Sequence, residues 1–124
     1  PLVNLHPILA AETVVAMQRG VRAVHVDPKV QRYIVEIVAS TRNAEQIEVG
    51  ASPRGSLGLL HAAQAYAALQ GRAYVLPDDV KRLAPGILAH RMVLSPEARA
   101  RGVDDLEVVA DLINRIPVPV GVEK

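Results

Sequence analysis

The stretch Gly50-Ala51-Ser52-Pro53-Arg54-Gly55-Ser56 (GASPRGS, residues 50–56) marks the start of the central helix that the sequence predicts. Ser52 suits the N-cap, because its hydroxyl can accept a hydrogen bond from a free backbone N–H. Pro53 then falls at the first helical position, where the missing N–H costs nothing. Arg54 follows in the first turn, where a cation is unfavourable by roughly a few tenths of a kcal/mol because the helix amides are partly positive. An anion opposite Arg54 would reverse that sign.

The two glycines of this stretch also raise the alternative of a loop that holds a nucleotide phosphate by itself. Gly50, Gly55 and Ser56 fit the pattern G-x-x-x-x-G-K-[ST] of a P-loop, but the lysine is absent. Pro53 removes a further backbone N–H from the middle of the loop. No glycine-rich loop with that lysine occurs elsewhere in the chain. Arg54 is therefore either a solvated side chain or a cation brought to a phosphate that another part of the protein holds.

Apolar residues repeat at helical spacing on both sides of this stretch. The spacing predicts helices over about 10–24, 28–41, 52–69, 77–88 and from Asp104 or Asp105 to Ile116. The faces expected to be apolar are Val14, Met17, Val21 and Val24 in the first helix and Val30, Tyr33, Ile34, Ile37, Val38 and Thr41 in the second. The helix over 52–69 is apolar around nearly its whole circumference, which predicts a central, buried helix.

Prolines and short extended pieces divide these helices. His25-Val26 runs into a helix that Asp27 caps, and Tyr74-Val75 runs into the helix that starts at Pro77. We expect the two extended pieces to lie side by side as a parallel bridge. Pro85 is expected to kink or split its helix.

The sequence thus predicts an all-α fold, a compact helical bundle of about five helices with at most a tiny two-stranded parallel β bridge. We expect a linker over residues 1–9, a helical domain over 10–117 and a C-terminal tail over 118–124. Between the second and third helices, residues 42–51 are expected to form a polar loop.

Composition excludes several classes of function. The 124 residues make one domain, and the net charge of +1 gives no basic field for nucleic acid. The chain has no cysteine, no apolar run that could span a membrane, and no N-terminal signal peptide. Its histidines, His6, His25, His61 and His90, form no zinc-binding pair, so no metal site is expected. No G-x-S-x-G elbow or pair of carboxylates indicates catalysis by this chain alone.

Four segments together resemble one family. Val24–Asp27, Gly50–Gly55, Tyr74–Val80 and Leu83–Arg91 have the order and spacing of the C-terminal lid of MoxR-type AAA+ ATPases, related to the lids of magnesium-chelatase-like proteins. The resemblance covers about residues 7–119. The sequence departs from the family at Leu76, where Thr or Ser is frequent, at Gly55 and Gly58, where alanine is common, and before the first helix, which lacks a strong cap.

The resemblance implies that Arg54 is the sensor-2 arginine, which contacts the terminal phosphate of ATP, with Ser52 and Pro53 beside it. It also implies a preceding core domain that carries the P-loop, the Walker B acids and sensor 1, so this fragment should be inactive alone. ATP with Mg²⁺ would bind only to the full-length protein. That protein would be a cytoplasmic homo-oligomer, expected to be a hexamer, that couples ATP hydrolysis to chaperone-like maturation of client proteins.

The residues alone leave two other functions open. Helices joined by extended pieces are also found in helix-turn-helix proteins, which favours a nucleic-acid-binding module, although the low net charge opposes it. A plain protein-interaction domain without a role in ATP hydrolysis is the other alternative. An Arg54 side chain neutralised by a carboxylate of its own domain would favour that one.

Overall fold

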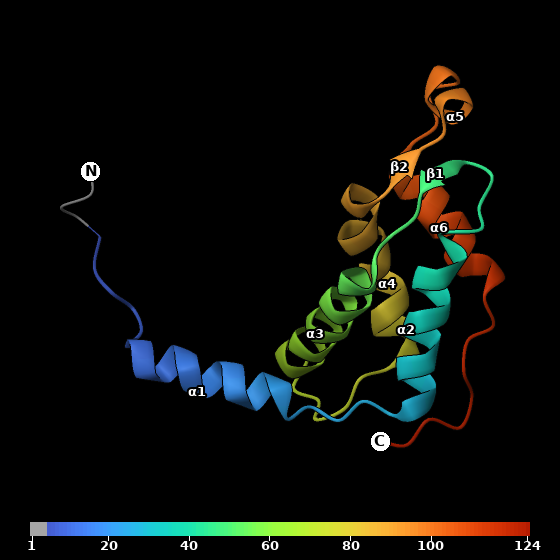
Figure 1. Cartoon of the computed structure of the whole chain (residues 1–124). Helices are drawn as coiled ribbons and strands as arrows, with labels where there is room; N and C mark the ends of the chain where they lie inside the picture. Colours follow the sequence, from blue (N-terminus) through green and yellow to red (C-terminus); the bar gives the residue numbers. More distant parts are fainter. Residues whose placement is uncertain (1–4) are drawn as a thin grey trace.

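The computed structural model describes residues 5–124, which contain six α-helices and one short sheet (Figure 1). The elements in chain order are α1 (Ala11–Arg22), α2 (Pro28–Ser40), β1 (Ile47–Val49), α3 (Pro53–Leu69), α4 (Pro77–Leu88), a 3₁₀ turn (Ala89–Arg91), β2 (Val93–Leu94), α5 (Pro96–Ala100) and α6 (Asp105–Arg115). The mostly helical fold class is confirmed. Of the linker expected over 1–9, residues 1–4 lie outside the described residues, and the division into linker, domain and tail stays a prediction.

The core lies between α2, α3, α4 and α6. It is built from small and branched aliphatic side chains, because the chain has no Phe or Trp. Its largest fully buried members are Tyr33, Ile34, Ile37, Leu59, Leu88 and Ile113. Five residues of α2 that were predicted to face the core, Val30, Tyr33, Ile34, Ile37 and Val38, are all buried.

Helix α3 begins and ends where the sequence predicts, but it is buried on one side only. Its buried residues are Gly55, Leu59, Ala63, Gln64 and Ala67. Leu57 is 56% exposed and Leu69 is 81% exposed, so the prediction of burial all round is wrong. The reason is that α2 and α4 cover the inner side of α3, while α1 extends away from the body and leaves the outer side open (Figure 1).

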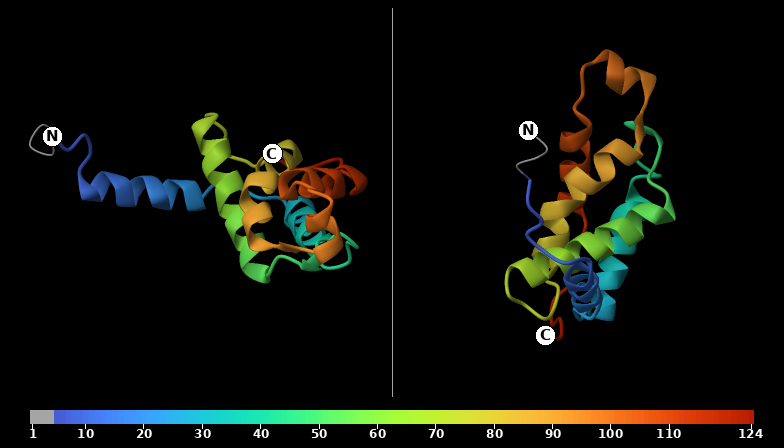
Figure 2. Two further views of the ribbon diagram at one scale, coloured as in Figure 1. Left: turned by 90° about the horizontal axis from the view of Figure 1, so that it is seen from above. Right: turned by 90° about the vertical axis from the view of Figure 1, so that its left-hand side faces the viewer.

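Helix α1 contradicts the expected apolar face. None of its twelve residues is buried, and Val14 and Met17 are 40% and 54% exposed. The left view of Figure 2 shows α1 as an arm beside the body formed by the other helices. The period of the apolar residues therefore predicted the helix correctly, but residues 5–124 cover the predicted face only at its C-terminal end, where Val21 is half-buried and Val24, just beyond the helix, is buried.

Two short strand pairings tie the loops together. The parallel bridge between His25 and Tyr74 is confirmed, with Val75 N donating to His25 O at 3.0 Å. The statement that this bridge is all the β structure is wrong, because β1 and β2 form an antiparallel pair in which Ile47 lies opposite Leu94. That pair lies over a small second core formed by Ile47, Leu94, Ala98 and Val108.

Proline has milder effects than expected. Helix α4 continues through Pro85 to Leu88, so the predicted split is wrong. Pro85 stands in the last turn, where its carbonyl still accepts from the N–H of Ala89. Pro96, expected to mark a turn, begins the five-residue helix α5, whose N-cap Ser95 accepts from the N–H of Ala98 at 3.3 Å.

Residues after α6 run back along the start of α2. Lys29 Nζ donates to the carbonyl of Gly121 at 2.7 Å, and the N–H of Glu123 donates to Asp27 Oδ2 at 2.7 Å. The other oxygen of Asp27 caps α2 by accepting from the N–H of Lys29, as predicted. Asp27 therefore joins the C-terminal residues to the first turn of α2.

Candidate functional site

The loop that leads into α3 is fixed by contacts to the end of α2. Thr41 is 1% exposed; its hydroxyl donates to Val38 O at 2.6 Å and accepts from the N–H of Ala51 at 2.9 Å. Arg42 Nε donates to the carbonyl of Ala51 at 3.2 Å. A Cβ atom on Gly50 would lie 2.8 Å from Arg42 Cα, so only glycine lets the two backbones approach this closely.

The first turn of α3 is fixed on its inner side by Gly55. This residue is buried, and a Cβ atom there would lie 3.1 Å from Leu88 Cδ2 of α4. Gly55 therefore lets the first turn of α3 pack closely against α4. At Gly58 the equivalent atom would lie 3.7 Å from Ile87, which is an ordinary contact, so the structure gives no steric need for glycine there.

The three residues proposed to bind nucleotide lie together on the surface at this helix start. Pro53 is the first residue of α3 and Ser52 is its N-cap, as predicted, and the Ser52 carbonyl accepts from the N–H of Gly55 at 2.8 Å. The expected hydrogen bond from the Ser52 hydroxyl to the helix is not made.

Arg54 is exposed and carries no counter-ion in the part of the chain that the structure describes. Ion pairs within residues 5–124 join Arg72 to Asp79 and Arg99 to Glu48. Arg54 takes part in neither, so its guanidinium projects from a rigid helix start without a partner of its own. A cation in this position can bind an external anion, but it supplies neither a nucleophile nor a general base.

A second cation near this helix start was missed. Arg91 ends the 3₁₀ turn after α4, and its Nε donates to Ile87 O at 3.1 Å. Arg91 Nη2 also lies 3.9 Å from the Cβ position of Gly58. Gly58 is one helical turn after Arg54 and shares its face. The spacing of Arg54 and Arg91 in the sequence gives no sign of this proximity.

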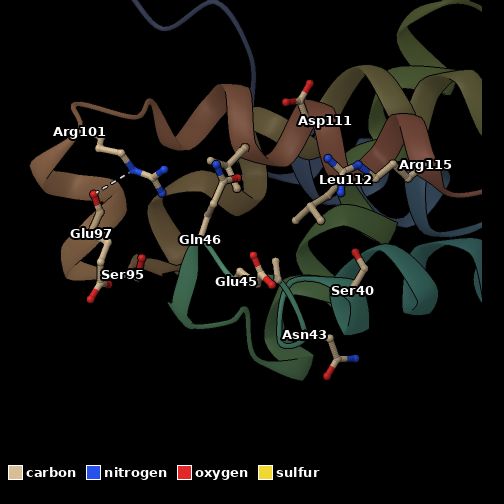
Figure 3. Close-up of a pocket in the computed structure, with 12 residues that line it drawn as sticks. Ser40, Asn43, Glu45, Gln46, Ser95, Glu97, Arg101, Asp111, Leu112 and Arg115 are labelled. Atoms are coloured by element: carbon tan, nitrogen blue, oxygen red, sulfur yellow. Dashed lines mark hydrogen bonds between the residues drawn. The ribbon is translucent and has the colours of Figure 1, made fainter.

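A large hollow among the described residues lies elsewhere. It has a volume of about 830 Å³ and lies between the loop after α2, α5 and α6 (Figure 3). Its walls carry Glu45, Glu97 and Asp111 together with Arg101 and Arg115. Charged side chains of both signs therefore line it. Arg101 follows directly after α5, and its Nε donates to the Glu97 carbonyl at 3.4 Å (Figure 3). This arrangement does not select one charge of ligand.

The described residues offer neither a metal site nor a membrane span. Within residues 5–124 no group of three or more His, Asp or Glu side chains could hold a metal ion. No helix in the same range is both long enough and apolar enough to cross a bilayer. His61 is exposed, and its Nδ1 lies 3.3 Å from Gln64 Oε1.

Comparison with known proteins places this geometry in a family. The model of the AAA lid domain matches residues 39–112, which include Arg54 and Arg91. The uncharacterized protein YeaC of Bacillus subtilis is 45% identical over 97% of the chain and 38% of its own length. Chaperone MoxR1 of Mycobacterium tuberculosis is 36% identical over 70% of the chain and 26% of its own length.

A solved structure shares the fold. The crystal structure of a protein from Cytophaga hutchinsonii, described as a candidate ATPase, superposes with a TM-score of 0.83 and 30% identity. The match covers 87% of the chain and 36% of that protein. The chain thus spans between about a quarter and two fifths of the length of these three proteins.

Proposed function

Because the chain belongs to the AAA lid domains, as a lid of the MoxR family of AAA+ ATPases, we propose that it senses ATP through Arg54. In the full-length protein, ATP with Mg²⁺ is held by a core domain that precedes the lid. Arg54 contacts the terminal phosphate, with Ser52 and Pro53 beside it. The lid then transmits the state of the nucleotide through a ring of subunits, a hexamer in our proposal, to client proteins that the cytoplasmic complex matures.

The unpaired Arg54 side chain is the observation that carries this proposal. Its neighbours each have a structural role, because Gly50 and Gly55 allow close contacts, Ala51 is fully buried and Pro53 starts the helix. Arg54 has no such role in residues 5–124, and it stands where a helix start disfavours a cation. A phosphate docked there removes the penalty, because amides and guanidinium then attract the same anion.

Arginine suits contact with a phosphoryl group in transfer. The guanidinium is always charged, and its planar fork matches two phosphate oxygens. Bound ATP with Mg²⁺ supplies the phosphoryl group, while the lid contributes only positive charge at the oxygens where negative charge collects. Arginines that reach a terminal phosphate from a neighbouring subunit accelerate transfer by about 10³–10⁵. We place Arg54 at or below the lower end of that range.

Because the start of α3 is held in place, Arg54 senses the bound nucleotide in addition to supplying positive charge. Because Thr41, Arg42 and Gly55 hold this loop to α2 and α4, a pull on Arg54 moves the helical body as one unit. Closure of the lid over nucleotide is then passed to neighbouring subunits as a rigid movement.

The test is ATP turnover by the full-length protein carrying Arg54→Ala. We expect the turnover number to fall by about ten- to a thousandfold, while the circular dichroism spectrum and the oligomeric state are unchanged. Arg32→Ala is the matched control, because Arg32 is exposed on α2 and remote from the start of α3. Normal turnover by the Arg54 variant would overturn the proposal.

A further inference from the structure

Helix α1 presents an apolar strip that residues 5–124 cover only at its C-terminal end, where Val21 is half-buried. Val14, Met17 and Val21 follow at spacings of three and four, which places them on one side of the helix. Val14 and Met17 are 40% and 54% exposed, and no residue of α1 is buried. Figure 1 shows α1 leading away from the other helices. The strip therefore meets solvent along most of its length.

Such a helix is poorly stabilised on its own. Isolated helices shorter than about 12–15 residues are marginal in water, and α1 has twelve. Its N-cap, Ala10, provides no side-chain hydrogen bond, and Gly20 lies within it. Most of the stability of an amphipathic helix comes from packing its apolar side. The composition of α1 thus calls for a partner surface.

The direction of α1 is fixed at its C-terminal end. Gln64 of α3 is 7% exposed, and its Nε2 donates to the carbonyls of Arg22 at 3.3 Å and Val24 at 2.9 Å. These bonds tie the end of α1 to the middle of α3. The strip is therefore held out from the body in a set direction, rather than being free to fold back onto it.

We propose that this strip docks onto the ATPase core that precedes the lid in the same polypeptide. The relatives are roughly three times the length of the chain, so most of such a protein is available to cover it. Exposed apolar residues continue from the strip toward the preceding chain, with Leu9 48%, Ile8 93% and Leu5 72% exposed. The proposal uses the core domain of the proposed function but does not depend on Arg54.

The size of the strip favours a covalently linked partner over a second copy of the lid. Twelve helical residues span about 18 Å, and one face of them is far smaller than the roughly 800 Å² that each partner buries in a stable dimer. A linked domain needs less contact, because it is present at an effective concentration of roughly millimolar. The polar flank carries Arg19 and Arg22 against one acid, Glu12, so we expect an apolar groove with an acidic rim on the core.

Amide hydrogen exchange of α1 tests the proposal in the full-length protein and in the 124-residue chain. We expect the α1 amides to exchange at least about tenfold more slowly in the full-length protein. The double variant Val14→Ala/Met17→Ala should remove that protection while leaving α1 helical, because alanine is a strong helix former. The matched control is Val35→Ala/Leu69→Ala, which trims residues that are 57% and 81% exposed on other helices and should leave the protection intact.

Two results would overturn the proposal: equal exchange of α1 in both proteins, or protection that appears only as protein concentration rises, which would mean a second copy. Arg54→Ala serves as an independent reference. It should abolish most ATP turnover and leave α1 protection unchanged, so failure of either proposal is seen separately.

Discussion

Arg72 and Asp79 form a bidentate ion pair that joins the extended piece at Tyr74 to the start of α4. Arg72 Nη2 lies 2.7 Å from Asp79 Oδ1, and Nη1 lies 2.8 Å from Oδ2. Asp79 Oδ2 also accepts from the N–H of Leu76 at 2.8 Å, and Arg72 Nη1 donates to the Tyr74 carbonyl. The hydrogen bond to Asp79 raises the pKa of Arg72 above its ordinary value. The Asp79 carboxylate thus both caps the start of α4 and pairs with the Arg72 guanidinium.

Replacing Arg72 with Ala should lower the free energy of unfolding by about 3 kcal/mol, because it leaves the mostly buried Asp79 carboxylate without its counter-ion. Urea denaturation of the 124-residue chain measures the loss. Glu48→Ala is the control, since it breaks the half-exposed pair with Arg99 at 3.6 Å and should cost less than about 1 kcal/mol. Similar losses in the two variants would show that the buried Arg72–Asp79 pair contributes no more to the free energy of unfolding than the exposed pair.

Gly50→Ala should destabilise the loop before α3. Its new Cβ atom would lie 2.8 Å from the backbone of Arg42, which cannot move without disturbing α2, so we expect a loss of about 1–3 kcal/mol. Gly20→Ala is the matched substitution, because nothing lies within 4 Å of the added atom and alanine favours a helix by roughly 0.5–1 kcal/mol. Thermal melts of both variants should therefore shift in opposite directions.

Sequence periodicity correctly predicted which side of a helix is buried only where other helices of this chain pack against it. In α2, apolar spacing identified the face that neighbouring helices bury. It failed at α1, because the period reports that a face needs a partner but not whether that partner lies in the chain. It also missed β1 and its pairing with β2, since a three-residue strand is too short for alternation to be read and Ile47 pairs with the distant Leu94.

The candidate site was only partly predictable. Helix-capping rules placed Ser52 and Pro53 correctly, and the resemblance singled out Arg54. Physical reasoning from the residues alone did not decide whether the Arg54 side chain is solvated or binds an anion, because a counter-ion from another domain leaves no trace in this sequence. Arg91 was missed because its proximity to α3 depends on the path of α4, which continues through Pro85. Leu76 has no side-chain group that could cap α4. The carboxylate of Asp79, in the first turn of the helix, instead accepts a hydrogen bond from the backbone N–H of Leu76.

Tyr33→Phe should leave the stability at neutral pH unchanged or raise it by up to about 1–2 kcal/mol. Tyr33 is 1% exposed, and within residues 5–124 its hydroxyl has no hydrogen-bond partner. Burial, with a smaller contribution from Asp78, raises the pKa of Tyr33 above its ordinary value of 10.0. The unfolded phenol therefore ionises first, so native stability falls as pH rises past 10, and the Phe variant should lack this fall. Tyr74→Phe, compared by urea denaturation, is the control.

Stability at acid pH should depend on Asp27. The N–H groups of Glu123 and Lys29 hold the pKa of Asp27 below its ordinary value of 3.8. A lowered folded pKa means that the contribution is complete above pH 3.8 and is lost as pH falls through the folded value. Asp27→Asn should therefore be less stable than the native chain at pH 7, and the gap should close below about pH 4.

Urea midpoints measured across this pH range give the comparison for Asp27. Asp111→Asn provides the reference, because Asp111 is exposed on α6 and should show little gap at either end of the range. A gap for Asp27→Asn that does not change with pH would mean that the amide, rather than the lost charge, causes the effect.

Arg54→Ala in the 124-residue chain should not destabilise the fold. The side chain is exposed, has no ion pair within residues 5–124 and stands in the first turn of α3, so its loss should change the free energy of unfolding by less than about 0.5 kcal/mol. Arg54→Glu should raise stability by roughly 0.3–1 kcal/mol, because an acid complements the helix start, and added salt should shrink this gain. Urea denaturation at low and high salt checks both. A loss above about 1 kcal/mol for Arg54→Ala would mean that the guanidinium supports the lid itself, and a fall in ATP turnover could then no longer be assigned to a missing contact with phosphate.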